Sequence, residues 1–309
     1  MRARSVVRAE VTPGAVLLAC SVPILFLHVK YQPGVRVPLR STHLGIELSD
    51  VAVLVVALAA VREGVRRGFE PLRAGMPLWI VSAALLGWMA LRTESLVHAV
   101  TAAKFAEYAL LALSAPLVLR RRADWELVAS AAGAWSAVAT LVALLQFFGA
   151  DISDAWPAGR RQPSFLGHSD FAALSALALG IGLAALVIGR RRLGWAPVVA
   201  GGAGLVLAGT SAGLVGAAAG ALVLLYSAAR RQALRRSDVL VAGAVVAVVA
   251  AGVLTLRAGD FEQFLRFLHV DRQERSSTAN VQTYAHHTLL VYVGYRIWLG
   301  HKVTGVGLL

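Results

Sequence analysis

The sequence predicts an all-α, polytopic membrane protein with about nine transmembrane helices, a cytoplasmic N-terminus and an extracytoplasmic C-terminal segment. The chain is 58% hydrophobic and 15% charged, with a mean hydropathy of +0.68, whereas a soluble domain carries about a quarter charged residues. Its apolar residues form blocks of roughly 20 residues, enough to cross a hydrocarbon core of about 30 Å. The basic residues, which give a net charge of +13, lie almost entirely between these blocks. That distribution favours membrane topology over a nucleic-acid partner.

The first apolar block follows Arg2, Arg4 and Arg8 and resembles a signal peptide. Its exit through Lys30 and Tyr31 lacks the small-residue pattern of a cleavage site, so we interpret it as a retained first helix. The predicted spans cover residues 14–29, 44–61, 76–91, 96–119, 127–148, 171–189, 194–208, 212–229 and 239–256.

The orientation follows from clusters of arginine between alternate spans. With the N-terminus inside, each cytoplasmic segment is strongly basic and the outer loops carry fewer basic residues, as the positive-inside rule requires. The cytoplasmic clusters are Arg2, Arg4, Arg8; Arg62, Arg66, Arg67, Arg73; Arg120, Arg121, Arg122; Arg190, Arg191, Arg192; and Arg230, Arg231, Arg235, Arg236.

Residues 194–229 are nearly continuous in hydrophobicity, but arginines at both ends require an even number of crossings. We predict two spans separated by an outer turn at Gly209, Thr210 and Ser211. Small residues let membrane helices approach closely, so we expect the glycines of this segment to bring its two helices together. These are Gly201, Gly202, Gly204, Gly213, Gly216 and Gly220.

Residues 1–256 therefore form the predicted bundle, and 257–309 begin a large extracytoplasmic loop with short helices at 261–270 and 284–299. The chain ends without a helix that returns to the membrane, so we expect a truncated reading. Cys20 is the single cysteine, and no histidine pair has metal-ligand spacing with a third ligand. We predict no metal and no cofactor, and interpret His28, like His43, His98 and His269, as an interfacial residue.

The outer loop between the fifth and sixth predicted spans gathers Arg160, Arg161, His168 and Asp170. It leads into a helix whose N-terminus faces outward, where the helix dipole favours an anion. The two guanidinium groups would add forked donors for phosphate oxygens. Alternatively, Asp170 or Ser169 caps the helix and the arginines meet lipid headgroups.

Three further groups are candidates. Ser211 lies at another outward-facing helix N-terminus, where it would either cradle an anion or cap the helix. Lys104 and Glu107 share one face of the fourth span and could pair, as a substrate relay or as a packing contact. In the outer segment, His287 is a candidate general base or a solvated residue, and Arg296 lies nine positions on, toward the opposite helix face.

Several segments together resemble the O-antigen ligase and polymerase family of bacterial envelope glycosyltransferases. The similar stretches are AKFAEYALLAL at 103–113, LVALLQFFG at 141–149, RQPSFLGHSDFAA at 161–173, LAGTSAGLVG at 207–216 and HTLLVYVGYRIWLGHKVTGVG at 287–307. The sequence departs from the family pattern where Ser211 and His287 replace arginines and Lys302 replaces a proline.

The resemblance implies a metal-independent enzyme of the bacterial inner membrane, with no cofactor, active in lipopolysaccharide or polysaccharide biosynthesis. Its donor would be an undecaprenyl-diphosphate-linked glycan and its acceptor a lipid core sugar, a glycan or a protein. Arg160, Arg161, Asp170, Ser211 and Arg296 would then bind the diphosphate, and His168 and His287 would be catalytic. The family's own catalytic histidine falls later in the large loop. A carrier for lipid-linked sugars that uses the Lys104 and Glu107 pair is the alternative.

Overall fold

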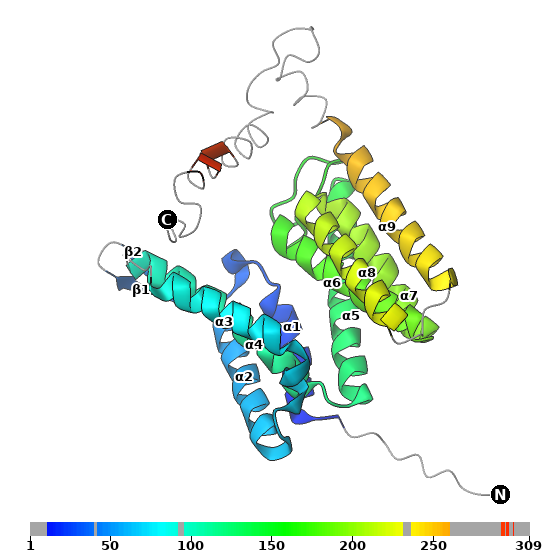
Figure 1. Ribbon diagram of the computed structural model, residues 1–309. Helices are drawn as coiled ribbons and strands as arrows, with labels where there is room; N and C mark the ends of the chain where they lie inside the picture. Colours follow the sequence, from blue (N-terminus) through cyan, green and yellow to red (C-terminus); the bar gives the residue numbers. More distant parts are fainter. Residues whose placement is uncertain are drawn as a thin grey trace, which may run out of the picture.

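The computed structural model describes residues 11–39, 42–91, 96–230 and 236–259, together with positions 292, 293, 295, 296 and 299. Most of these residues are helical (Figure 1). The helices are α1 (Pro13–Leu25), α2 (Leu48–Arg67), α3 (Met76–Leu91), α4 (Leu96–Val118), α5 (Arg122–Phe147), α6 (His168–Val187), α7 (Arg191–Ala208), α8 (Ser211–Arg230) and α9 (Arg236–Leu256), with short 3-10 helices η1 (Val29–Tyr31) and η2 (Glu70–Gly75). Each of the nine predicted spans thus corresponds to a helix of the described chain.

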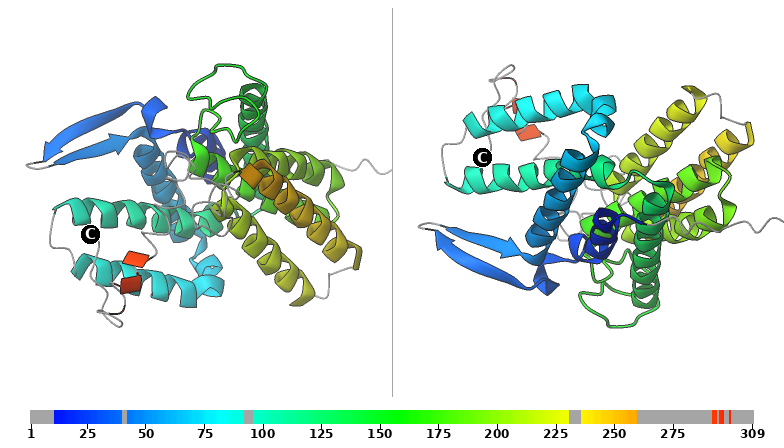
Figure 2. Two further views of the ribbon diagram at one scale, coloured as in Figure 1. Left: turned by 90° about the horizontal axis from the view of Figure 1, so that it is seen from above. Right: turned by 90° about the horizontal axis from the view of Figure 1, so that it is seen from below.

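The helices form two groups with α1 between them (Figures 1 and 2). Helices α5 to α9 surround one core, whose largest fully buried side chains include Phe171, Leu174 and Leu205. Helices α1, α2 and α4 share a second core around Val56 and Val118. At the start of α1, the backbone N–H of Thr12 donates to the buried carboxylate of Asp124, while the Thr12 hydroxyl donates to the carbonyl of Val118. These two hydrogen bonds connect the start of α1 to the junction between α4 and α5.

A two-stranded antiparallel hairpin, β1 (Gly34–Leu39) and β2 (Thr42–Glu47), precedes α2 and projects from the helices (Figure 2). The prediction that a span begins at residue 44 is therefore wrong, because Leu44 and Ile46 belong to a strand. The helix begins only after Glu47, whose backbone N–H donates to the carboxylate of Asp50. This cap satisfies a backbone donor that a helix start leaves without an intrahelical partner.

Helix α7 packs along α6 through a row of glycines that we call the glycine seam: Gly182, Gly194, Gly201 and Gly204. A Cβ atom at Gly201 would lie 2.5 Å from the backbone of Ser175 and Leu179 on α6. The prediction that these glycines bring α7 and α8 together is wrong for most of them, although Gly213 of α8 lies against α7, where a Cβ atom would be 2.9 Å from the side chain of Leu205. Gly201 and Gly204 face α6, whereas Gly216 and Gly220 of α8 have open space beside them.

Four helical segments of the described chain are long and apolar enough to cross a membrane: Arg122–Phe147, His168–Val187, Ser211–Arg230 and Val239–Leu256. Pro13–Leu25, Trp79–Leu91 and Leu193–Ala208 are apolar but shorter. Helix ends also differ from the edges of the apolar blocks. Helix α5 begins at Arg122 because Asp124 accepts the N–H of Arg121 in its first turn. Helix α2 continues to Arg67, which pairs with Glu63 one turn earlier at 3.1 Å.

Candidate functional site

The loop between α5 and α6 is built on two fully buried glutamines. The Gln146 amide accepts from the N–H of Ser164 at 2.9 Å and donates to the carbonyls of Ile152 and Ser164. The Gln162 amide accepts from the N–H of Trp156 at 2.8 Å and donates to the carbonyls of Trp156 and Pro157. These side chains replace the hydrogen bonds that a loop lacks, so the loop is held in one shape against the helix ends.

Arg161 lies between this loop and the turn that joins α7 to α8. Its guanidinium carbon stands 4.5 Å from the centroid of the Trp156 ring, a cation–π arrangement. Its side-chain stem packs on Gly209, where a Cβ atom would lie 3.0 Å from the Cβ of Arg161. The neighbouring residue Gln162 donates its backbone N–H to the carbonyl of Leu207 at 2.8 Å. Contacts from two segments far apart in sequence therefore position the predicted phosphate-binding arginine.

His168 begins α6 and contacts the same indole, with ring centroids 4.4 Å apart and an interplanar angle of 75°. Both of its ring nitrogens are buried and lack a hydrogen-bond partner among the described residues. Trp156 thus brings two predicted site residues, Arg161 and His168, to one ring.

The helix-capping alternative for Asp170 and Ser169 is wrong. The residue before α6 is Gly167, with φ +83°, and no side chain caps the helix. Glycine suits this position because its positive φ is unfavourable for other residues and because a Cβ atom would lie 2.6 Å from the ring of His28. Asp170 is half-buried in the first turn of α6.

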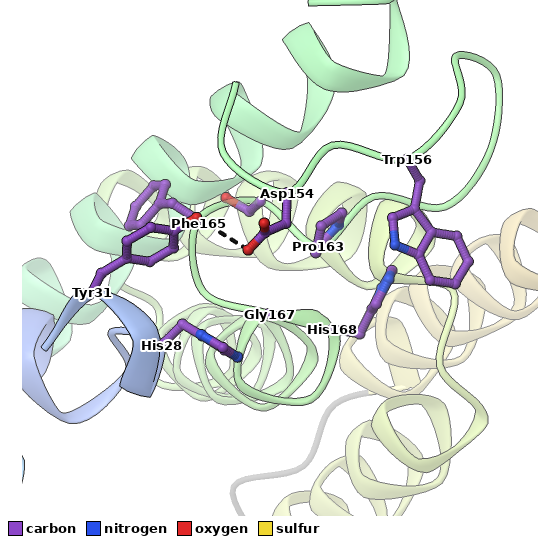
Figure 3. Close-up of a pocket in the computed structure, with 9 residues that line it drawn as sticks. His28, Tyr31, Asp154, Trp156, Pro163, Phe165, Gly167 and His168 are labelled. Carbon is purple, nitrogen blue, oxygen red and sulfur yellow. Dashed lines mark hydrogen bonds between the residues drawn. The ribbon is translucent and has the colours of Figure 1, made fainter. Parts of the chain in front are cut away.

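A pocket of about 210 Å³ lies beside Trp156 and His168, between the loop and the corner formed by α1 and η1 (Figure 3). We call it the corner pocket. His28, Tyr31 and Asp154 complete its polar wall, with the Tyr31 hydroxyl donating to Asp154 at 3.1 Å (Figure 3). Nδ1 of His28 accepts the N–H of Lys30, so in a neutral imidazole the proton lies on Nε2.

The two sides of this pocket are joined by an exposed ion pair. Lys30 Nζ lies 2.6 Å from Asp154 Oδ1. The hydrogen bond from Lys30 lowers the pKa of the Asp154 carboxyl below its ordinary value of 3.8, and the hydrogen bond from Tyr31 acts in the same direction. The carboxylate correspondingly raises the pKa of the Lys30 ammonium group above 10.5.

Ser211 and Arg160 are not among the residues that contact Trp156 or line the corner pocket. Thr210, not Ser211, caps α8, because its hydroxyl accepts the N–H of Gly213 at 3.2 Å. The Ser211 hydroxyl instead accepts from the guanidinium of Arg257 at 3.4 Å. Arg257 is buried at the end of α9 and was not singled out from the sequence. Arg160 is exposed on the loop.

Lys104 and Glu107 lie within ion-pair distance, 3.6 Å between Nζ and Oε2. The closer partner of Lys104 is Asp50, at 2.5 Å, in the first turn of α2. Since Asp50 also caps α2, the three side chains join the start of α2 to one face of α4. None of these three residues lines the corner pocket.

The remaining predicted residues belong to the segment that follows α9. His287 and the predicted helix at 261–270 are outside the described residues. Arg296 is an exposed helical residue and does not line the corner pocket. Across that same part of the chain, no three His, Cys, Asp or Glu side chains are grouped to hold a metal ion.

No protein family, curated protein or solved structure matches this chain. The function therefore rests on the chemistry of the site.

That site contains residues that sequence reasoning missed: His28, Tyr31, Asp154 and Trp156. Tyr31 and Asp154 are 123 positions apart, and no local spacing predicts their contact. One signal was present, since Gln146 is a polar residue at the end of an apolar block and so needs buried partners.

Proposed function

We propose that this chain is a membrane glycosyltransferase of the O-antigen ligase type, which transfers a glycan from a polyprenyl-diphosphate carrier to an acceptor at the extracytoplasmic face. The observation that carries the proposal is the placement of Arg161 and His168 around Trp156. A guanidinium offers paired donors to phosphate oxygens, and an imidazole can accept a proton from a hydroxyl. The two functions that glycan transfer from a diphosphate requires are therefore neighbours.

In the proposed reaction, the acceptor hydroxyl oxygen forms a bond to the anomeric carbon of the glycan. The bond from that carbon to the diphosphate oxygen breaks, and its electron pair leaves with the diphosphate. Arg161 stabilises the negative charge that develops on the leaving group, and His168 accepts the hydroxyl proton. The glycan acceptor would be a lipid core sugar, another glycan or a protein hydroxyl.

We further propose that all nine helices span the bacterial inner membrane, with the N-terminus cytoplasmic. Large apolar side chains on α8 and α9, including Leu222, Val223, Leu240 and Val248, are more than half exposed and suit contact with lipid. The arginine clusters orient the α5–α6 loop outward. Membrane lipids would thus surround the bundle and present the donor beside the site.

The test is glycan transfer by the full chain in proteoliposomes that contain an undecaprenyl-diphosphate-linked oligosaccharide and a lipid-linked acceptor sugar. We expect Arg161→Ala to lower the transfer rate by about 100-fold, as for loss of one oxyanion-stabilising donor. Arg161→Lys should be intermediate, because it keeps the charge and loses the fork. Arg122→Ala, which removes an exposed arginine at the first residue of α5, is the matched control. Full transfer by Arg161→Ala would refute the proposal.

The alternative is a carrier for lipid-linked sugars that uses the group of Lys104, Glu107 and Asp50. The observation that favours it is the presence of three charged side chains on two predicted spans, where ionised groups are costly. A carrier predicts that Lys104→Ala abolishes movement of a fluorescent lipid-linked sugar between vesicle leaflets, while Arg161→Ala has no effect on it. Loss of glycan transfer in Arg161→Ala, with transfer retained in Lys104→Ala, would favour the enzyme.

A further inference from the structure

The corner pocket has the size of a small polar ligand. Its volume of about 210 Å³ equals the liquid volume of roughly seven water molecules and lies below the range of about 300–1,000 Å³ that is typical of drug-sized ligands. One wall is fixed, since Gly167 and His28 are in close contact. A single sugar ring is an occupant of this size.

The polar groups around the pocket suit hydroxyl groups. Buried polar atoms are normally hydrogen-bonded, yet neither nitrogen of His168 has a partner in the described chain. Asp154 uses one lone pair of each oxygen, for Lys30 and for Tyr31, and a carboxylate has about four such sites. The wall therefore offers free acceptor sites at the exposed carboxylate of Asp154, which the hydroxyl groups of a ligand can satisfy as donors.

The pocket also has apolar walls and little net charge. Trp156, Phe165 and Tyr31 line it, and aromatic rings provide a flat apolar surface for the C–H face of a sugar. The carboxylate of Asp154 is compensated by Lys30 at 2.6 Å. A neutral sugar ring therefore fits better than an anionic ligand.

We propose that the corner pocket binds one neutral sugar ring, the terminal residue of the acceptor, with a hydroxyl directed at the carboxylate of Asp154. The role of this sugar as the acceptor rests on the proposed function, whereas the binding of a neutral sugar does not. His28, Tyr31, Asp154 and Trp156 are the binding residues that this assignment adds.

Saturation-transfer NMR on the full chain in nanodiscs tests this assignment, with methyl β-D-glucopyranoside and methyl β-D-galactopyranoside as probes. We expect saturable binding of one or both in the millimolar range and none of cyclohexanol, which has the ring but only one hydroxyl. Trp156→Ala should weaken binding by about two- to tenfold, because an aromatic contact contributes about 0.5–1.5 kcal/mol. Trp125→Ala, at an exposed tryptophan near the start of α5, is the matched control.

Asp154→Asn gives a second variant that preserves side-chain shape, and it should weaken binding several-fold. No saturable signal with either glycoside would overturn the assignment, as would equal binding by wild type, Trp156→Ala and Asp154→Asn. The NMR experiment contains no glycan donor, so it tests sugar binding separately from transfer. If neither glycoside binds while glycan transfer is intact, only the assignment of the corner pocket is refuted. Intact binding without transfer refutes the proposed function alone.

Discussion

Replacing Gln146 with leucine removes the polar support of the α5–α6 loop while keeping a similar side-chain volume. The amide of Gln146 is fully buried and makes hydrogen bonds of 2.9 Å from the N–H of Ser164, 2.7 Å to the carbonyl of Ile152 and 3.2 Å to the carbonyl of Ser164. Leucine would leave all of these backbone groups without this partner.

The expected cost follows from these contacts. A buried hydrogen bond contributes about 1 kcal/mol net, so the loss of this set destabilises the closed loop by about 3 kcal/mol. That free energy corresponds to a roughly 150-fold increase in the equilibrium constant for local opening of the loop. The cores around Phe171 and Val56 do not include Gln146, so the helices should remain folded.

Hydrogen exchange measured by mass spectrometry on nanodisc-embedded protein would test this magnitude. Peptides covering residues 150–166 should exchange faster in Gln146→Leu, whereas peptides from α7 and α9 should be unchanged. Ser130→Ala, which removes an exposed hydroxyl bond to the carbonyl of Glu126 on the same helix, should leave the loop protected. Wild-type exchange in the loop, or equal acceleration in every helix, would refute the reasoning.

Three further outcomes follow from other contacts. Gly209→Ala should lower the free energy of unfolding by about 1–2 kcal/mol, because Gly209 has φ +59°; an unchanged melting temperature would contradict this. The pKa of the Asp154 carboxyl is lowered by Lys30, so the stabilisation from this ion pair is present above about pH 3.8 and is lost as the pH falls through the lower folded-state pKa. In a carboxyl NMR titration, the pKa of Asp154 should therefore be higher in Lys30→Met than in wild type. Lys104→Met should destabilise the protein by about 1 kcal/mol through the carboxylate of Asp50, and Lys104→Arg should restore most of it; equal melting temperatures for both variants would argue against this ion pair.

Hydrophobic blocks predicted where helices lie, and they did so best where charge and turn residues bound the block on both sides. Helix α3 matches its predicted range, 76–91, at both ends. The hairpin was missed because Leu44 and Ile46 were assigned to the apolar block that begins after them, although their alternation with His43, Gly45 and Glu47 is typical of a strand. Glycine content predicted close helix packing but not the partner, since a glycine's position along the chain does not tell which neighbour it faces.

For the site, the sequence placed Arg161 and His168 on one loop, and local spacing was enough for that. It could not reveal Trp156 as the ring that both contact, nor the contribution of His28 and Tyr31 from the end of α1. Those contacts depend on how the two helix groups dock, which composition and periodicity do not encode.

The glycine seam also restricts how far α6 and α7 can move relative to each other. At Gly182 and Gly201 the backbones of α6 and α7 are in direct contact, so little space is left there for one helix to slide or rotate against the other. The loop before α6 and the turn after α7 therefore lie close together, and the hydrogen bond from the N–H of Gln162 to the carbonyl of Leu207 joins them directly. The corner of α1 and η1 contacts this loop through the solvent-exposed pair of Lys30 and Asp154 and through the close approach of His28 to Gly167. Widening of the corner pocket on the α1 side would therefore have to break the ion pair of Lys30 with Asp154 and separate His28 from Gly167.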